Sequence, residues 1–156
     1  MFSLIVTIIS IALVAALAVA SIYYGGAAFT QGSAKANASA LVAEAQQIAG
    51  ANDLYANDNA GAFSADVATL VSGSFLSAAP APPTTVAPIT PGFVLGGTAS
   101  NTISIKLSTG ALNVCEEVNV EAIGGTPSTP PAAQQTNQQF GCYNDATNGL
   151  TFFYKG

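Results

Sequence analysis

The sequence predicts an α+β fold in which a long helical N-terminal region is followed by a small domain of short strands and loops. Three observations point to this fold. The first 24 residues are almost wholly apolar, and residues 34–55 repeat apolar side chains at helical spacing. The C-terminal half holds short alternating runs between Pro- and Gly-rich segments. A chain of 156 residues suits one domain with an appended helix.

The composition excludes several classes of protein. Half of the residues are hydrophobic and only 7% are charged, against about 25% in an average soluble domain. Since the chain has no His, it has neither a Ser-His-Asp arrangement nor an imidazole metal site, and no nucleophile-base pair is visible. We therefore expect no enzyme and no cofactor. Three Lys, no Arg and a net charge of −5 argue against nucleic acid as a partner.

The N-terminal segment of residues 1–24 is long enough to span a membrane as a helix. No charged side chain precedes Lys35. At 1.5 Å per residue, this segment reaches about 36 Å, which exceeds the bilayer core. Three interpretations compete. A signal peptide needs a basic start, which is missing here, although residues 18–20 resemble a cleavage site. A plain anchor normally has a positive flank. The third interpretation is a helix that leaves the membrane and packs against copies of itself.

The residue pattern of this segment favours the third interpretation. Ser3, Thr7 and Ser10 share one helical stripe. A roughly opposite face carries a series of small residues that lets helix backbones approach closely, namely Ala12, Ala16 and Ala20. A helix that is apolar all round must be buried on all sides, by lipid or by identical helices. An ordinary anchor also uses Ala and Ser freely, so both coverings stay open here.

A glycine-rich stretch at residues 25–33 separates this segment from the rest. Gly25, Gly26 and Gly32 each cost about 1 kcal/mol in a helix relative to Ala, so we expect the helix to break or loosen here. A second helix is expected over residues 34–55, with a stripe of apolar residues that faces a core: Ala34, Ala38, Leu41, Ala45, Ile48 and Tyr55. The polar run 57–61 is expected to end it.

The remaining residues, within a predicted domain of residues 34–156, read as short elements between loops. A short helix is expected over residues 65–71, capped by Ser64 and closed by Gly73. Strands are expected at residues 93–95, 102–107 and 150–154. Prolines prevent regular structure over residues 80–91, and a second Pro-rich loop covers residues 124–139. Residues 112–123 fit either an alternating strand or a helix.

The two cysteines, Cys115 and Cys142, favour a disulfide outside the cytoplasm, because their even count follows a membrane-type segment. The loop between them would contribute about 3.5 kcal/mol on the chain-entropy model. Two buried free thiols are the alternative. The nearby Glu116, Glu117 and Glu121 have the oxygen chemistry of a Ca²⁺ site, but a solvated acidic face is the simpler interpretation, and we expect no metal.

Taken together, these parts resemble a type IV pilin, and the type IVb subclass in particular. The resemblance lies in the order of parts: the uncharged helix, its amphipathic continuation, the stretch LVSGSFLSAAP at residues 70–80, the region closed by Cys115 and Cys142, and the strand of residues 150–155. It implies a long N-terminal helix packed on a small antiparallel sheet, with a disulfide-closed C-terminal region. It also implies a helix over residues 111–123, and a Met1 that is N-methylated after leader removal.

Two features depart from that family. Type IV pilins generally carry Glu at mature position 5, where this chain has Ile5. If Met1 is the mature start, van der Waals packing must set the stagger between subunits. No basic leader ending in Gly is present either, so the chain is in mature form or the standard peptidase site does not exist.

The resemblance implies a major pilin that polymerises through its N-terminal helices into a surface pilus serving adhesion, aggregation or motility. Its partners are then copies of itself, the inner membrane before assembly and the pilus assembly machinery there, and its final location is extracellular. The expected filament-core residues are Met1, Phe2, Leu4, Ile5, Ile8, Ile9, Ala12, Leu13, Ala16, Leu17 and Ala20. The alternatives are a minor pilin or pseudopilin of a pilus or secretion system, and a single-pass anchored binding module.

Overall fold

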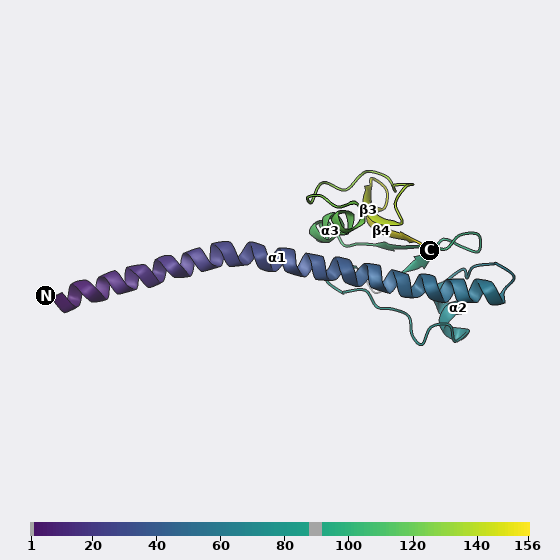
Figure 1. Ribbon diagram of the computed structural model, residues 1–156, viewed down its shortest axis with the longest axis horizontal. Coiled ribbons are helices and arrows are strands. Elements are labelled where there is room, and N and C mark those ends of the chain that lie inside the picture. The colour runs from purple at the N-terminus through teal and green to yellow at the C-terminus, as the bar shows by residue number, and fades with distance from the viewer. Residues whose placement is uncertain (1, 88–91) are drawn as a thin grey trace. The chain divides into compact units, whose positions relative to one another are not determined.

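The fold is α+β, as predicted. The computed structural model describes residues 2–87 and 92–156. Within them lie three helices and four strands, in the order α1 (Phe2–Asp58), α2 (Val67–Ser72), β1 (Val94–Leu95), β2 (Thr102–Lys106), α3 (Leu112–Ile123), β3 (Phe140–Asp145) and β4 (Gly149–Lys155) (Figure 1). The chain divides into two compact units, Met1–Ser33 and Ala34–Gly156.

Helix α1 runs without interruption through the glycine-rich stretch, so a break at Gly25, Gly26 and Gly32 is not found, while the alternative expectation of a local loosening stays a prediction. A break costs more than the glycines do, because it would leave up to four C=O groups before it and four N–H groups after it without helical partners. Nearby hydroxyls also bond to helix carbonyls: Ser21 donates to Leu17 O at 2.8 Å and Thr30 to Gly26 O at 3.2 Å. These bonds leave the helix intact instead of capping a new end.

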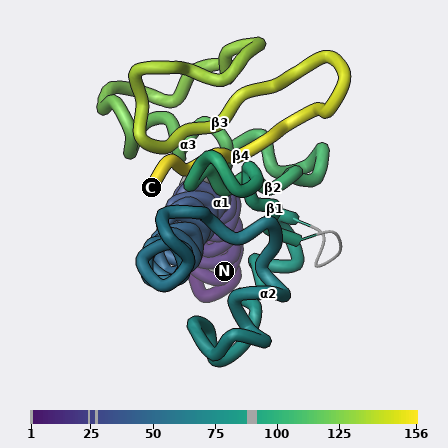
Figure 2. The backbone as a smooth tube through the Cα atoms, turned by 90° about the vertical axis from the view of Figure 1, so that its right-hand side faces the viewer, coloured from purple at the N-terminus to yellow at the C-terminus, as the bar shows by residue number. Residues whose placement is uncertain are grey.

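The second half of α1 buries one face in the core of the folded unit. The predicted stripe of Ala34, Ala38, Leu41, Ala45 and Ile48 is buried, which confirms its helical spacing. Tyr55 completes it half-buried, with its ring 5.4 Å from that of Phe75 in an edge-on contact. Figure 2 looks roughly along α1 and shows the strands gathered on one side of this half of the helix. Helix and sheet therefore share one hydrophobic core.

The four strands form an antiparallel sheet in the order β1-β2-β4-β3. Strand β4 is central, with Phe152 opposite Ile105 on one side and opposite Cys142 on the other. The three predicted strands correspond to β1, β2 and β4, while β3 was not predicted. Its sequence FGCYND lacks alternation and contains residues with poor strand propensity, so its pairing with β4 is what makes it a strand.

Residues 112–123 are helical, which settles the ambiguity in favour of α3. The predicted Cys115–Cys142 disulfide is confirmed and joins α3 to β3, with the two Cα atoms 5.3 Å apart. Asn119 strengthens this junction, because its amide donates to Cys142 O at 2.9 Å and accepts from Cys142 N at 2.8 Å. One side chain thereby satisfies the backbone of an edge strand beside the disulfide.

Helix α2 is capped by Asp66 and not by Ser64. The Asp66 carboxylate accepts hydrogen bonds from the N–H and the hydroxyl of Thr69, at 2.7 and 2.8 Å, in the usual N-cap geometry. Ser64 is buried instead, with its N–H donating to Asn52 Oδ1 at 2.8 Å. The predicted C-terminal residue, Gly73, does close the helix.

Candidate assembly surface

The feature that a function must explain is the uncovered apolar surface of α1 before Ala34. An 18-residue window of this helix has a mean hydropathy of 2.8 and none of it is buried, so the helix is long and apolar enough to cross a membrane. Phe2 is 86% exposed. The other large apolar side chains here are also exposed: Leu4, Ile5, Val6, Ile8, Ile9, Ile11, Leu13, Val14, Leu17, Val19, Ile22, Tyr23 and Phe29. We call residues 2–33 the apolar segment.

Water is a poor environment for this segment. Burying one such side chain fully is worth about 1.5–3 kcal/mol, and soluble monomers rarely expose contiguous apolar patches beyond a few hundred Å². The segment therefore needs lipid or protein around it.

Three hydroxyl groups of the segment are compatible with an apolar environment. Thr7 donates its hydroxyl proton to Leu4 O, and Ser10 donates to Val6 O, both at 2.8 Å. Ser33 bonds to Thr30 O at 3.0 Å in the same way. Each donor is satisfied inside the helix itself, so burying these residues in lipid or against another helix leaves no unpaired O–H.

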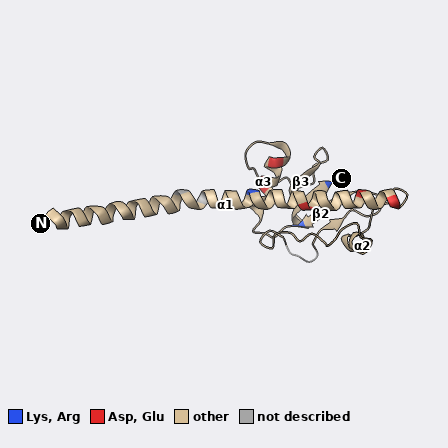
Figure 3. Ribbon diagram, turned by 60° about the horizontal axis from the view of Figure 1, so that its bottom comes forward, with Lys and Arg blue, Asp and Glu red and all other residues tan. Residues whose placement is uncertain are grey.

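Charged side chains are confined to the part of the chain that follows the apolar segment. Lys35 is the first charged residue, and every Lys, Asp and Glu of the chain follows the apolar segment (Figure 3). Covering the segment therefore requires no ion to be desolvated. Packing against a second copy would likewise require no charge complementarity.

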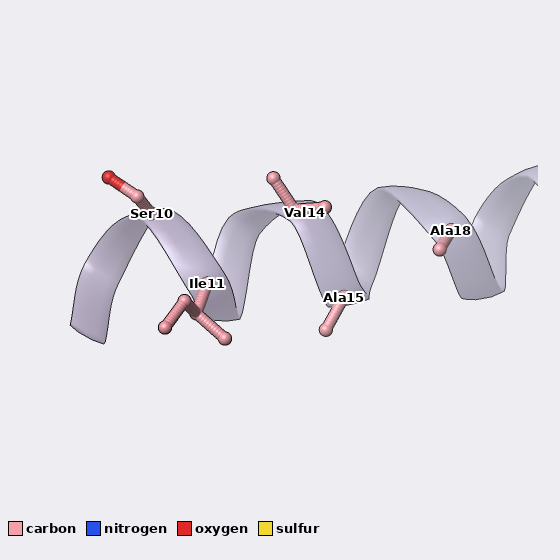
Figure 4. Close-up of a pocket in the computed structure, with 5 residues that line it drawn as sticks. All are labelled: Ser10, Ile11, Val14, Ala15 and Ala18. Atoms are coloured by element: carbon pink, nitrogen blue, oxygen red, sulfur yellow. The ribbon is translucent and has the colours of Figure 1, made fainter. Parts of the chain in front are cut away.

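One face of the segment has a shallow hollow lined by Ser10, Ile11, Val14, Ala15 and Ala18. In Figure 4, Ser10 and Val14 project along one edge of this hollow and Ile11 and Ala15 along the other. The two Ala leave space between the larger side chains. Such space lets a partner helix approach closely and place an apolar side chain there.

The predicted filament-core residues from Phe2 to Ala20 all lie exposed on α1, together with the predicted small-residue series. Met1, with its predicted processing and methylation, lies outside the described residues. The sequence-based reasoning missed Phe29, which is 82% exposed and extends the apolar segment past the glycines. Its signal was present in the sequence, but the expectation of a helix break at residues 25–33 concealed it.

The nearest carboxylate to the segment along α1, Glu44, belongs to the folded unit. Its Oε2 is buried, and no hydrogen-bond partner for it lies among the residues that the structure describes. Burial raises the pKa of the Glu44 carboxyl above its ordinary value. Around Glu116, Glu117 and Glu121, no group of three potential metal ligands is found among the described residues.

The long apolar helix, the small antiparallel sheet and the Cys115–Cys142 disulfide are consistent with a pilin-like fold. No known family matches the chain. No curated protein and no solved structure matches it either.

Proposed function

We propose that the chain is the major structural subunit of a type IV-like surface pilus, polymerised through its apolar segment. The observation that carries the proposal is the segment itself: a continuous, uncharged apolar helix with exposed large side chains, joined to a disulfide-bonded domain. Such a subunit has two tolerable environments, the membrane before assembly and the interior of a polymer after it. Head-to-tail contacts that do not close on themselves then produce a helical filament.

The folded unit supports an extracellular location. A Cys115–Cys142 disulfide persists in oxidising compartments and is rare in the cytosol. In the proposed filament this unit forms the outer surface, where exposed Thr, Asn, Gln and Pro side chains of residues 124–139 are available for contacts. Adhesion, aggregation and motility are the roles that we propose for such a filament.

A second candidate function is a single-pass anchored binding module that works as a monomer. It is favoured by the apolar segment alone, since one helix of this length and composition suffices to cross a membrane. A minor pilin or pseudopilin that primes a pilus or secretion system is a variant of the main proposal. Abundance in the filament separates it from a major subunit.

Electron microscopy of material sheared from the cell surface tests the proposal, with mass spectrometry of its main band. We expect thin filaments whose dominant protein is this chain and which disappear when its gene is deleted. The N-terminal peptide from the same band also shows whether Met1 is processed and methylated. Filaments that persist without the chain, or a chain found only as a detergent-soluble monomer from the membrane fraction, would contradict a structural polymer.

A further inference from the structure

The face of the sheet turned away from the α1 core carries a row of polar side chains. The strand register places Lys106 of β2, Thr151 of β4 and Tyr143 of β3 directly opposite one another. Their neighbours Ile105, Phe152 and Cys142 form the adjacent row and are buried in the core. Because successive side chains of a strand point to opposite faces, the polar row lies on the outer face.

This row forms a groove. Two long side chains, Lys106 and Tyr143, flank the short Thr151, and neighbouring strands are about 4.8 Å apart, which separates the flanking residues by about 10 Å. Thr151 is only 7% exposed, as expected for a groove floor. With Ser104 and Asn148 these residues line a cavity of about 220 Å³. Drug-sized sites span about 300–1,000 Å³, so this cavity suits a single ring-sized group.

The polar groups in this groove have unused hydrogen-bonding capacity. For Lys106 Nζ, Ser104 Oγ and the Tyr143 hydroxyl, the structure gives no hydrogen-bond or ion-pair partner within residues 2–87 and 92–156. The Asn148 amide donates to Asp145 Oδ2 at 2.7 Å, which orients it and leaves its carbonyl oxygen as an acceptor. By contrast, Lys155 is fully engaged, donating to Gln135 O and Thr136 O at 3.0 Å and lying 5.3 Å from the Phe153 ring centre.

We propose that this groove, lined by Lys106, Tyr143, Ser104, Thr151 and Asn148, binds a saccharide that carries a carboxylate. The Lys106 ammonium pairs with the carboxylate in a charge-assisted hydrogen bond, the strongest contact available there. The Tyr143 ring offers an apolar surface for the sugar ring. Ser104 and Asn148 supply one hydroxyl and one carbonyl oxygen for the sugar hydroxyls. The Lys106 side chain is exposed and has no ion-pair partner among the described residues, so its ammonium favours an anionic group over a neutral one. The Asp145 carboxylate next to the groove is engaged by Asn148 and by the N–H of Thr147.

The test is a titration of the full-length chain in detergent micelles with glucuronate, glucose and acetate, followed by ligand-observed NMR and calorimetry. Glucuronate combines the ring and the carboxylate, glucose lacks the charge and acetate lacks the ring. We expect glucuronate to bind at least about tenfold more tightly than either, because an ion-assisted hydrogen bond is worth about one decade of affinity or more.

Three variants locate the site. Lys106→Gln should lower glucuronate affinity at least about tenfold, to the level of glucose. Ser104→Ala should weaken both sugars without touching the charge. The matched control is Lys35→Gln, which removes an exposed lysine from α1, outside the groove, and should leave binding unchanged. Circular dichroism and the intact disulfide verify folding of each variant.

Several outcomes would overturn the proposal. If glucose equals glucuronate, the groove does not recognise the carboxylate. If acetate equals glucuronate, it does not recognise the sugar. Undetectable binding of glucuronate, or an equal loss in Lys106→Gln and Lys35→Gln, would also exclude this groove as the site.

Discussion

Three buried asparagines join segments of the folded unit that are far apart in the sequence. Asn52 on α1 donates to Asn101 Oδ1 at 2.9 Å, and Asn101 donates to Asp53 Oδ1 at 2.7 Å. Asn119 does the same for α3 and β3. Each of these amides is less than a tenth exposed. Removing one of these side chains leaves its buried partners with neither a hydrogen bond nor contact with water. This costs more free energy than the hydrogen bond itself contributes.

Replacing Asn119 by Ala should therefore be strongly destabilising. The change leaves both the N–H and the C=O of Cys142 unsatisfied next to a buried disulfide, and we expect a loss of about 2 kcal/mol or more in the free energy of unfolding. Chemical denaturation measures it. Asn113→Ala on the exposed side of the same helix is the control and should change stability by less than about 0.5 kcal/mol. Equal effects of the two variants would contradict this role of Asn119.

The pH dependence of stability has two opposing parts. Hydrogen bonds from Thr69 hold the pKa of Asp66 below its ordinary value of 3.8, and those from Thr147 and Asn148 do so for Asp145. Both contributions are present above pH 3.8 and are lost as the pH falls through the lowered values. Glu44 acts in the other direction, because burial raises its pKa above 4.5 and its charged form is disfavoured in the folded state.

Glu44→Gln should consequently raise the free energy of unfolding at pH 7. In the wild-type chain this free energy should increase as the pH falls through the raised pKa toward 4.5, and the variant should lack that increase. Urea denaturation between pH 3 and 7 measures both effects. The loss of stability below pH 3.8 should persist in the variant, since it belongs to Asp66 and Asp145. If the variant shows the same dependence of stability on pH above 4.5 as the wild-type chain, Glu44 does not cause that dependence.

At the scale of elements, the apolar segment and the buried stripe belong to one helix because its hydrogen-bond ladder never stops. The three glycines of the 25–33 stretch have nothing within 4 Å of where a Cβ would stand, so they are not required for packing in the subunit. They weaken the helix locally and leave it intact. Such positions are where α1 opens most easily.

Changing Gly25, Gly26 and Gly32 together to Ala should make this part of α1 harder to open. Each substitution adds about 1 kcal/mol of helix propensity, so amide exchange around residues 21–35 should slow about fivefold per substitution. Hydrogen exchange of the chain in detergent micelles measures this. Gly50→Ala in the same helix, where a Cβ also meets nothing, is the control and should not affect those amides. Unchanged exchange in the triple variant would refute the local weakness.

Most of the fold could be predicted from the sequence, because its strongest signals are periodic. Three sequence patterns correspond directly to the structure: the apolar stripe from Ala34 to Ile48, the alternation in β2 and the pair of cysteines. Strand β3 could not be predicted, since its pairing is decided by β4 and not by its own residues. The Asp66 cap was missed because Ser64 is as good a cap by residue type, and only tertiary contact with Asn52 removes it from that role.

The candidate surfaces were predictable to different degrees. The apolar segment can be identified from composition alone, because an uncharged apolar run is evident in the sequence without knowledge of its tertiary contacts. The groove at Lys106 could not be predicted from the sequence, because it depends on which strands are neighbours in the sheet. Lys106 and Tyr143 are separated by a helix and a long loop in the sequence, and only the register across β4 brings them together.

At the scale of the whole molecule, the proposed filament makes a prediction that membrane anchoring does not. Ala16→Ile places a large side chain in the small-residue series while keeping the segment apolar. Membrane insertion should be retained, whereas filament yield should fall sharply because helix backbones can no longer approach closely. Val6→Ile is the matched control, enlarging an exposed position that is already bulky and lies outside both the small-residue series and the hollow.

Membrane flotation and the yield of sheared filaments measure the two properties for both variants. Filaments that form equally well with Ala16→Ile would show that this series does not lie at a close helix contact. Loss of membrane insertion in either variant would show that the changes act on the segment itself and not on assembly.

The position of β4 in the sheet has a consequence for how the chain reaches its final compartment. β4 is the last strand in sequence order, yet it is the one strand of the described sheet that pairs with both β2 and β3. In the export that our proposed function implies, the buried stripe of α1 and the strands β1 and β2 would emerge before residues 149–155, which complete the sheet. In the proposed pilin, the core against α1 therefore stays incomplete until the last strand has crossed the membrane, so the end of translocation would set the time at which folding is completed.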